Sequence, residues 1–265
     1  MTGPLTQHRA RKRFGQNFLI DRQVIGQILD AINCQPRDHI VEIGPGLGAL
    51  TEGLIHSAAR LTVVEIDRDL AADLRHRYGQ RPHFQLHQAD ALTLDFSTLG
   101  QGEALRIVGN LPYNISTPLL FHLLDYRPAI SDMCFMLQKE VVERLAAAPG
   151  SKNYGRLSIM MQYHCQVRSV LTVPPQAFRP APKVTSAVVR LLPHPSPPWE
   201  AIDMGLFSHL VKTCFQQRRK TLRNSLKLVP GGSEIDGSMV DLSARPESLA
   251  VEDFVTLANL LAQTD

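Results

Sequence analysis

Residues 42–48 read E-I-G-P-G-L-G, at the point where an apolar run ends and a helical pattern begins. Glycines let the backbone turn sharply and approach a ligand closely, and the N-terminus of the following helix favours a negatively charged group. Glu65 stands 21 residues after Gly44, at the end of the next apolar run, where a carboxylate can accept hydrogen bonds from two ribose hydroxyls. These features predict a site for an adenosine-type cofactor, against the alternative of a tight turn that binds nothing.

This glycine stretch does not decide which adenosine-type cofactor binds. Gly44, Gly46 and Ala49 also satisfy the G-x-G-x-x-G/A pattern of nicotinamide enzymes. A methyl donor and a hydride carrier therefore both remain open at this point of the chain.

Strand-like and helix-like patterns alternate on both sides of the glycine stretch. We expect strands near 39–43, 61–66, 83–87, 105–109 and 132–137, and helices behind Asp21 and near 48–57, 68–78, 117–125 and 139–147. Such alternation predicts an α/β fold with a parallel sheet, whose ligands sit at the carboxyl ends of the strands. Residues 167–173 and 184–192 indicate two further strands, expected as a closing antiparallel pair.

A proline-rich stretch predicts a domain boundary. Residues 193–198 hold four prolines in six positions, which neither a helix nor a central strand accommodates. We expect one α/β domain at 1–192, with a flexible basic arm at 1–13, a linker at 193–198 and a small all-α domain at 199–265.

Composition and charge indicate a globular protein with a polyanionic partner. The chain has 265 residues, 44% of them hydrophobic and 20% charged, which excludes disorder, collagen and coiled coil. The net charge is only +3, yet residues 1–20 carry four basic side chains and 212–227 carry six, with no acid in either segment. Two acid-free clusters favour nucleic acid as the partner over two merely solvated faces.

The cysteines and the apolar runs argue against several other classes. Four scattered cysteines without a C-x-x-C pair predict neither a disulfide framework nor a metal site. No apolar run approaches the roughly 18 residues of a membrane helix, and no secretory signal begins the sequence. We expect a cytoplasmic monomer that does not bind membranes.

Residues 110–113 read N-L-P-Y and end the fourth expected strand. An exocyclic amine of a nucleobase is a poor nucleophile, because its lone pair is delocalised into the ring. The side-chain oxygen of Asn110 and a backbone carbonyl held rigid by Pro112 can accept its hydrogens, while Tyr113 stacks on the base. This arrangement suits methyl transfer to an amino nitrogen and has no evident use in hydride transfer. The structural alternative is a proline turn with a core tyrosine.

Two weaker signals flank this motif in the sequence. Asp90 follows the third expected strand and could accept a hydrogen bond from an adenine amino group, although aspartate is also an ordinary turn residue. Residues 178–184 (F-R-P-A-P-K-V) form a stiff loop that presents Phe178 and Lys183, either as a second stacking surface or as a plain connection.

Taken together, six stretches resemble the ribosomal RNA adenine dimethyltransferase family. They are residues 11–19 (R-K-R-F-G-Q-N-F-L), 41–51, 109–120 (G-N-L-P-Y-N-I-S-T-P-L-L), 136–143, 178–191 and 215–226 (F-Q-Q-R-R-K-T-L-R-N-S-L). They cover about residues 11–227 in the family's order. The resemblance implies a Rossmann-like, seven-stranded class I methyltransferase sheet with a small helical C-terminal domain that helps to dock rRNA.

The resemblance implies S-adenosylmethionine as cofactor and assigns its contacts. Asn17 and Leu19 would belong to the segment that closes over it, and Gly44 would lie under its methionine part. Glu65 would take the ribose hydroxyls and Asp90 the adenine amine.

The resemblance also assigns the acceptor site. Asn110 would border both the cofactor and the target nitrogen, with Leu111 and Pro112 completing the turn. Tyr113 and, opposite it, Phe178 would stack on a flipped adenine.

The implied reaction is transfer of methyl groups to N6 of two adjacent adenosines in the 3′-terminal hairpin loop of 16S rRNA, within the small (30S) ribosomal subunit, with a link to subunit biogenesis. We expect the basic residues to contact the rRNA: Arg11, Lys12, Arg13, Lys183, Arg218, Arg219, Lys220 and Arg223.

Three rival functions make different predictions. A nicotinamide dehydrogenase would be protected by NADH rather than by S-adenosylhomocysteine. A non-catalytic RNA-binding factor would be expected to have lost the motif at 110–113 or at 44–48, and both are present. A large-subunit rRNA dimethyltransferase that confers antibiotic resistance is disfavoured by residues 218–220 and by the stretch 178–191.

Overall fold

The computed structural model describes residue 11, residues 15–216 and residues 220–263. The chain divides into two compact units. The first comprises the described residues up to Val142 together with Arg168–Pro193, and the second comprises Glu143–Val167 and the described residues from His194 onward. The proline-rich boundary at 193–198 predicts that the segment 143–167 belongs to the first domain, whereas the structure groups this segment with the C-terminal helices.

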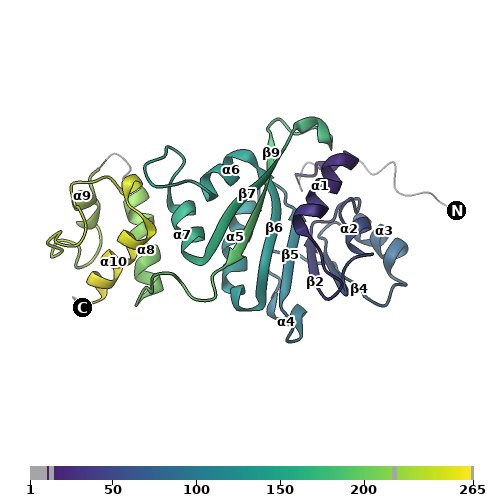
Figure 1. Cartoon of the computed structure of the whole chain (residues 1–265), viewed down its shortest axis with the longest axis horizontal. Coiled ribbons are helices and arrows are strands. Elements are labelled where there is room, and N and C mark those ends of the chain that lie inside the picture. The colour runs from purple at the N-terminus through teal and green to yellow at the C-terminus, as the bar shows by residue number, and fades with distance from the viewer. Residues whose placement is uncertain (1–10, 12–14, 217–219, 264–265) are drawn as a thin grey trace. The chain divides into compact units, whose positions relative to one another are not determined.

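The elements follow one another along the chain in this order (Figure 1): β1 (Phe18–Leu19), α1 (Arg22–Ile32), β2 (His39–Ile43), α2 (Thr51–Leu54), β3 (Arg60–Val64), α3 (Arg68–Tyr78), β4 (Phe84–His87), α4 (Ser97–Gly100), β5 (Leu105–Asn110), α5 (Ser116–Asp125), η2 (Arg127–Ala129), β6 (Ile130–Gln138), α6 (Lys139–Leu145), α7 (Arg156–His164), β7 (Cys165–Val173), η3 (Pro175–Ala177), β8 (Phe178–Arg179), β9 (Ser186–Pro193), α8 (Met204–Gln216), α9 (Leu222–Leu226), η4 (Pro246–Ser248) and α10 (Val251–Ala262).

A seven-stranded sheet has the order β4-β3-β2-β5-β6-β9-β7. Strands β4, β3, β2, β5 and β6 pair in parallel, and β9 runs antiparallel to β6. Figure 1 shows β2, β5, β6 and β9 side by side in this sheet. The chain moves outward from β2 in one direction through β3 and β4, and in the other through β5 and β6. The strand order therefore reverses between β2 and β5, where open α/β sheets bind their ligands. The expected class I methyltransferase sheet is confirmed.

Local sequence explains where the helices beside the site begin. Asp21 accepts hydrogen bonds from the backbone N–H groups of Gln23 and Val24 and so caps α1, and Asp67 caps α3 through the N–H of Asp69. The helix predicted near 48–57 is shorter than expected, because turns occupy the residues before Thr51 and α2 spans only one turn. The sequence analysis did not predict α7 or the short pair of strands β1 and β8.

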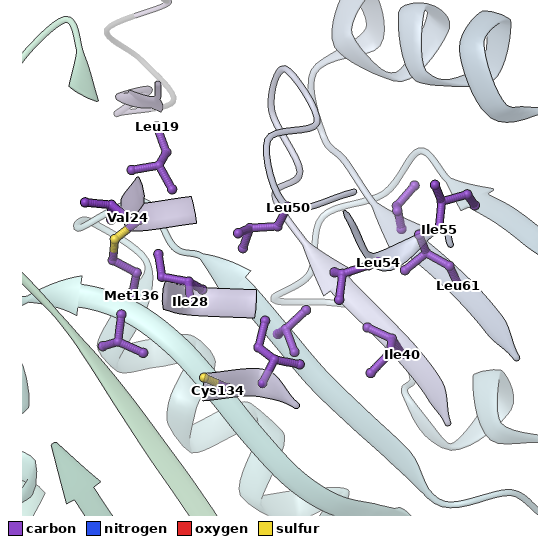
Figure 2. Packing of buried hydrophobic residues seen from close by; sticks show 14 of the residues in the cluster. Leu19, Val24, Ile28, Ile40, Leu50, Leu54, Ile55, Leu61, Cys134 and Met136 are labelled. Atoms are coloured by element: carbon purple, nitrogen blue, oxygen red, sulfur yellow. The ribbon is translucent and has the colours of Figure 1, made fainter. Parts of the chain in front are cut away.

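A buried apolar cluster connects α1 and α2 to the sheet. Figure 2 shows Val24 and Ile28 of α1 next to Met136 of β6, and Leu54 of α2 near Leu61 of β3. Burial of each such side chain stabilises the fold by about 2 kcal/mol. Helix α1 follows residues 15–19 and α2 follows the glycine turn after β2. The cluster therefore holds both of these segments against the sheet.

A buried ion-pair network anchors the start of β5. Arg106 donates from Nε to Asp132 Oδ1 at 2.7 Å and from Nη2 to Asp132 Oδ2 at 3.0 Å, and it also pairs with Asp38 just before β2. Arg190 of β9 adds a bond to the same Asp132 at 2.6 Å. These charges compensate one another, so the network ties β5 to β2, β6 and β9 at the end of the sheet that lies opposite Asn110.

The second unit packs through aromatic side chains. Tyr163 of α7 lies 4.8 Å from Phe207 of α8, and Phe215 of α8 lies 5.9 Å from Phe254 of α10, measured between ring centroids. In the described part of the chain, none of the helices has the length and apolar character that crossing a bilayer requires.

Candidate cofactor and acceptor site

A cavity of about 270 Å³ opens in the first unit at the carboxyl ends of the parallel strands. Its walls come from the segment 15–19, the glycine turn after β2, Glu65 and Ile66 after β3, residues 89–91 after β4, and residues 110–115 after β5. The parallel sheet explains this gathering, because all four strands end at the same edge.

The glycine turn needs its glycines for two reasons. Gly44 and Gly46 adopt φ angles of 66° and 58°, in the left-handed region that other residues avoid. A Cβ atom on Gly46 would lie only 3.1 Å from the ring of Phe18. The missing side chain therefore lets the segment 15–19 lie directly against the turn.

Glu65 presents a buried carboxylate to the cavity. The backbone N–H of Gly46 donates to Oε2 at 3.2 Å, and the N–H of Asp67 donates to Oε1 at 2.9 Å. Burial raises the pKa of Glu65, and these backbone bonds partly oppose that rise. Each oxygen can still accept a further hydrogen bond, as two neighbouring hydroxyls would require.

Asp90 lies beside Glu65 at the end of β4. The backbone N–H of Leu92 donates to its Oδ1 at 2.9 Å, which fixes the carboxylate in the turn. The N–H of Ala89 donates to the backbone oxygen of Glu65 at 3.2 Å, so the two strand ends stay together. Both predicted carboxylates therefore line one cavity.

Residues 15–19, which we call the strap, cover the cavity. The side-chain amide of Asn110 donates to the backbone oxygen of Asn17 at 3.2 Å, and Gln16 donates to Asp67 Oδ2 at 3.1 Å. Leu19, at the end of the strap, pairs with Phe178 in the β1–β8 ladder. The strap therefore contacts Asp67, close to Glu65, and also the turn at residues 110–113, which we call the acceptor turn.

Arg11, a predicted RNA contact, pairs with acidic side chains of its own chain in this structure. Its guanidinium pairs with Asp67 Oδ1 at 2.8 Å and also with Asp69, while its backbone N–H donates to Gln16. Two carboxylates already neutralise this cation, because the chain folds it back onto the start of α3. In this structure Arg11 fastens the strap.

The turn at residues 110–113 lines the cavity. The N–H of Leu111 donates to the backbone oxygen of Met136 at 3.1 Å, which attaches the turn to β6. Because Nδ2 of Asn110 donates to the strap, its side-chain oxygen is turned toward the other side and can accept. Tyr113 is half-buried and lines the cavity rather than the interior of the protein.

Phe178, predicted as a second stacking surface, is buried in this structure. Its ring is only 4% exposed and belongs to the apolar cluster with Val24, Ile28 and Met136, and it is absent from the cavity wall. In the β1–β8 pair Phe178 lies opposite Leu19. Its apolar surface is better buried there than beside a polar turn. In this structure Phe178 pairs with the end of the strap, and its stacking on the acceptor base opposite Tyr113 stays a prediction.

Of the remaining predicted RNA contacts, the three that the structure describes are absent from the cavity wall. Lys183, Lys220 and Arg223 are exposed. Lys12, Arg13, Arg218 and Arg219 lie outside the residues that the structure describes.

Sequence reasoning missed three polar residues around the cavity. Gln16 joins the strap to Asp67, Glu42 is a buried carboxyl in the cavity wall, and Ser186 holds the hydroxyl of Tyr113. Gln16 lies in the stretch 11–19 and Glu42 in the stretch 42–48. A polar side chain inside each of these motifs was the sequence feature that could have indicated a role in the site. Ser186 also lies inside a quoted stretch, at 178–191, but its pairing with Tyr113 could not be predicted because the two residues are 73 positions apart.

A family model and individual protein sequences indicate the same family for this chain. A family model described as ribosomal RNA adenine dimethylase matches residues 7–263. The ribosomal RNA small subunit methyltransferase A of Pseudomonas aeruginosa is 57% identical over 260 residues, covering 98% of this chain and 97% of that protein. The protein of the same name from Pseudomonas savastanoi is 57% identical over 258 residues, covering 97% and 96%.

Solved structures agree with the fold. A dimethyladenosine transferase from Plasmodium falciparum superposes with a TM-score of 0.78 at 27% identity, covering 91% of this chain and 95% of that one. The 23S rRNA methyltransferase ErmE superposes with a TM-score of 0.73 at 27% identity, covering 93% and 100%. Both similarities extend over nearly the whole chain.

Proposed function

Because the chain belongs to the ribosomal RNA adenine dimethylase family, we propose that it dimethylates N6 of two adjacent adenosines in the 3′-terminal hairpin loop of 16S rRNA. It is an S-adenosylmethionine-dependent rRNA adenine dimethyltransferase. The observation that carries the proposal is that Glu65 and the Asn110–Tyr113 turn line the same cavity.

The residues around the cavity fit S-adenosylmethionine. Glu65 offers two accepting oxygens for ribose hydroxyls, and Asp90 offers a carboxylate for an adenine amine. Gly44 leaves the turn open to close approach, and Asn17 and Leu19 cover the cavity from the strap. When bound, the cofactor supplies an electrophilic methyl group on a sulfonium.

The acceptor turn prepares the adenine amine for attack. The side-chain oxygen of Asn110 and the backbone carbonyl before Pro112 accept hydrogen bonds from N6, which favours a pyramidal nitrogen with an available lone pair. Tyr113 stacks on the flipped base, and Leu111 packs beneath the turn. With S-adenosylmethionine held by Glu65 and Asp90, N6 would take the methyl group and give up one proton in exchange, which would leave S-adenosylhomocysteine.

Positioning and electrostatics account for most of the expected acceleration. None of the side chains of residues 110–113 is a strong base at neutral pH, and the reaction needs none, because the positive charge disperses as the methyl group transfers. Extrusion of the base costs a few kcal/mol, and less in a hairpin loop than in a duplex.

The test is labelled-methyl transfer to three substrates: undermethylated small subunits, large subunits and free 16S rRNA, with the products mapped by mass. We expect four methyl groups per small subunit, two on each of two adjacent adenosines. Labelling of large subunits alone, or of another base, would contradict the proposal. Protection of the protein against heat by NADH rather than by S-adenosylhomocysteine would contradict the cofactor.

Exposed basic residues complete the proposal on the RNA side. We expect Lys183, Lys220 and Arg223 to contact rRNA phosphates, together with the predicted residues outside the described part of the chain. About six contacts in the segment 212–227 would give a slope of about −4 for log affinity against log salt.

A double variant tests this contribution. Lys220→Gln with Arg223→Gln should reduce the magnitude of the slope by about 1.4, since each lost phosphate contact removes about 0.7. Arg37→Gln, an exposed site before β2 at the opposite end of the strands from the cavity, is the matched control and should leave the slope unchanged. An unchanged slope in the double variant would show that these two cations form only a solvated face.

A further inference from the structure

The ring of Tyr113 is attached at its outer end. Its hydroxyl lies 2.8 Å from Oγ of Ser186, within hydrogen-bond distance. Tyr113 comes from the turn after β5 and lines the cavity, whereas Ser186 is the first residue of β9 and is fully buried. The bond therefore joins the acceptor turn to a different strand of the sheet, 73 residues further along the chain.

Ser186 is itself rigidly held. It stands opposite Gln138 in the antiparallel ladder between β6 and β9, and the neighbouring carbonyl of Thr185 accepts the N–H of Lys139 at 3.0 Å. A fully buried side chain in a paired strand has little freedom to move. The hydroxyl of Ser186 is thus a fixed point of the sheet.

The inner end of Tyr113 is held by the turn. Oγ of Ser116 donates to the backbone oxygen of Tyr113 at 3.2 Å, and the N–H of Ile115 donates to the oxygen of Pro112 at 3.1 Å. These bonds fix the backbone but leave rotation of the side chain about χ1 and χ2 open. Among the hydrogen bonds of the described residues, the bond to Ser186 is the one that holds the far edge of the ring.

We propose that Ser186 is a positioning residue for methyl transfer: its hydroxyl holds the Tyr113 ring at the angle at which the ring stacks on the acceptor base. This inference rests on the proposed function. Ser186 touches neither substrate nor cofactor and acts only through Tyr113. A ring fixed at both ends presents a preorganised wall, so the base is held within reach of the acceptors around Asn110.

A purely structural role is the alternative. A buried serine needs a partner for its hydroxyl, and the bond to Tyr113 would then only avoid an unsatisfied polar group. The two roles differ in what they change. Loss of a structural bond lowers the melting temperature, while loss of a positioning bond lowers the rate of transfer in the fully bound complex.

The experiment is a double-mutant cycle with Ser186→Ala and Tyr113→Phe. Tyr113→Phe removes the hydroxyl of the tyrosine but keeps its ring. Single-turnover transfer is measured with cofactor and small subunits saturating, and cofactor Kd is measured separately. We expect each single variant to transfer about tenfold more slowly, the scale of one lost hydrogen bond. Cofactor Kd should stay within twofold, and the double variant should be no slower than the slower single one, because both remove the same bond.

Ser158→Ala is the matched control. Ser158 is fully buried in α7, where its hydroxyl donates to the carbonyl of Arg144 and accepts from the N–H of Gly155, so this variant loses buried hydrogen bonds in the second unit. It should lower the melting temperature and leave the single-turnover rate unchanged. If Ser186→Ala does not fold, Tyr113→Phe and Ser186→Thr, which keeps a hydroxyl, decide the question: the first should be slow and the second close to the wild type.

Two results overturn the inference while leaving the proposed function intact. One is wild-type rates in Tyr113→Phe and Ser186→Ala despite lower melting temperatures. The other is multiplication of the two defects in the double variant. A wild-type protein that transfers no methyl group to any small-subunit RNA would instead refute the proposed function.

Discussion

Replacement of Asn110 by alanine should lower the rate of methyl transfer about 1000-fold or more, while the protein still binds S-adenosylmethionine. The side-chain oxygen of Asn110 is the acceptor that turns the lone pair of N6 toward the methyl group, and alanine offers nothing in its place. Removal of one such preorganised polar group from a water-excluded site commonly costs a factor of 100 to 1000. Here the loss also removes the bond from Nδ2 to the strap at Asn17.

Cofactor binding should weaken much less, by about tenfold at most. The residues expected to hold the cofactor's ribose and adenine, Glu65 and Asp90, keep their own backbone hydrogen bonds in this variant. Only one of the strap's contacts is lost, since Gln16 and Arg11 still bind Asp67. A cofactor Kd that rises as steeply as the rate falls would mean that Asn110 acts in cofactor binding alone.

The measurement combines calorimetric binding of the cofactor with labelled-methyl transfer to undermethylated small subunits. Asn153→Ala, in the second unit before α7, serves as the control and should transfer at the wild-type rate. Dimethylation retained in the Asn110 variant would reject the assigned role. Arrest at the monomethylated product would show that the amide is needed chiefly for the second transfer.

The sheet and the cavity could be predicted because their signals are local. Each strand end that contributes to the cavity is marked by residues next to it in the sequence: the glycines after β2, Glu65 after β3, Asp90 after β4 and Asn110 after β5. Parallel strands carry these ends to one edge, so a correct strand assignment was enough to bring the four together.

The parts that were not predicted depend on pairing between distant segments. Arg11 looked like an RNA contact because it stands in a basic segment, and only the folded chain brings it to Asp67, 56 residues away. Phe178 looked like a stacking surface because it begins a stiff loop, and the β1–β8 ladder instead buries it beneath Leu19. The segment 143–167 looked like part of the first domain because it precedes the proline-rich stretch. Its place in the second unit is set by packing of α7 against α8 and α10, which follow much later in the chain.

Glu42 is the residue whose chemistry the sequence least revealed. It is the fourth residue of β2 and the first of the quoted glycine motif, and a glutamate is expected to be exposed, yet it is only 2% exposed because all five residues of this strand are buried. Burial raises the pKa of Glu42 to about 7, against the hydrogen bond that Oγ1 of Thr51 donates at 2.6 Å, and the nearby charge of Glu65 adds to the rise. The carboxyl is therefore largely protonated in the folded protein at pH 6.

This raised pKa makes stability depend on pH in a defined direction. In the unfolded chain Glu42 loses its proton near pH 4.5, whereas in the folded protein it keeps the proton up to about pH 7. Between these values the folded state binds one more proton than the unfolded state, so the free energy of unfolding falls as the pH rises. A difference of 2.5 pH units corresponds to about 3 kcal/mol, lost by pH 8.

The variant Glu42→Gln should remove this loss. Glutamine stays neutral at every pH and its side-chain oxygen can still accept the hydrogen bond from Thr51. In denaturant unfolding of the cofactor-free protein, the variant should differ little from the wild type at pH 4.5 and gain on it steadily, by about 3 kcal/mol at pH 8. Glu52→Gln, at an exposed position on α2, is the matched control and should show no such trend.

A stability difference between Glu42→Gln and the wild type that stays constant from pH 4.5 to 8 would mean that Glu42 is ionised in the folded protein throughout that range. The cavity wall would then carry a further negative charge in addition to the carboxylates of Glu65 and Asp90, and burial would not dominate the pKa of Glu42.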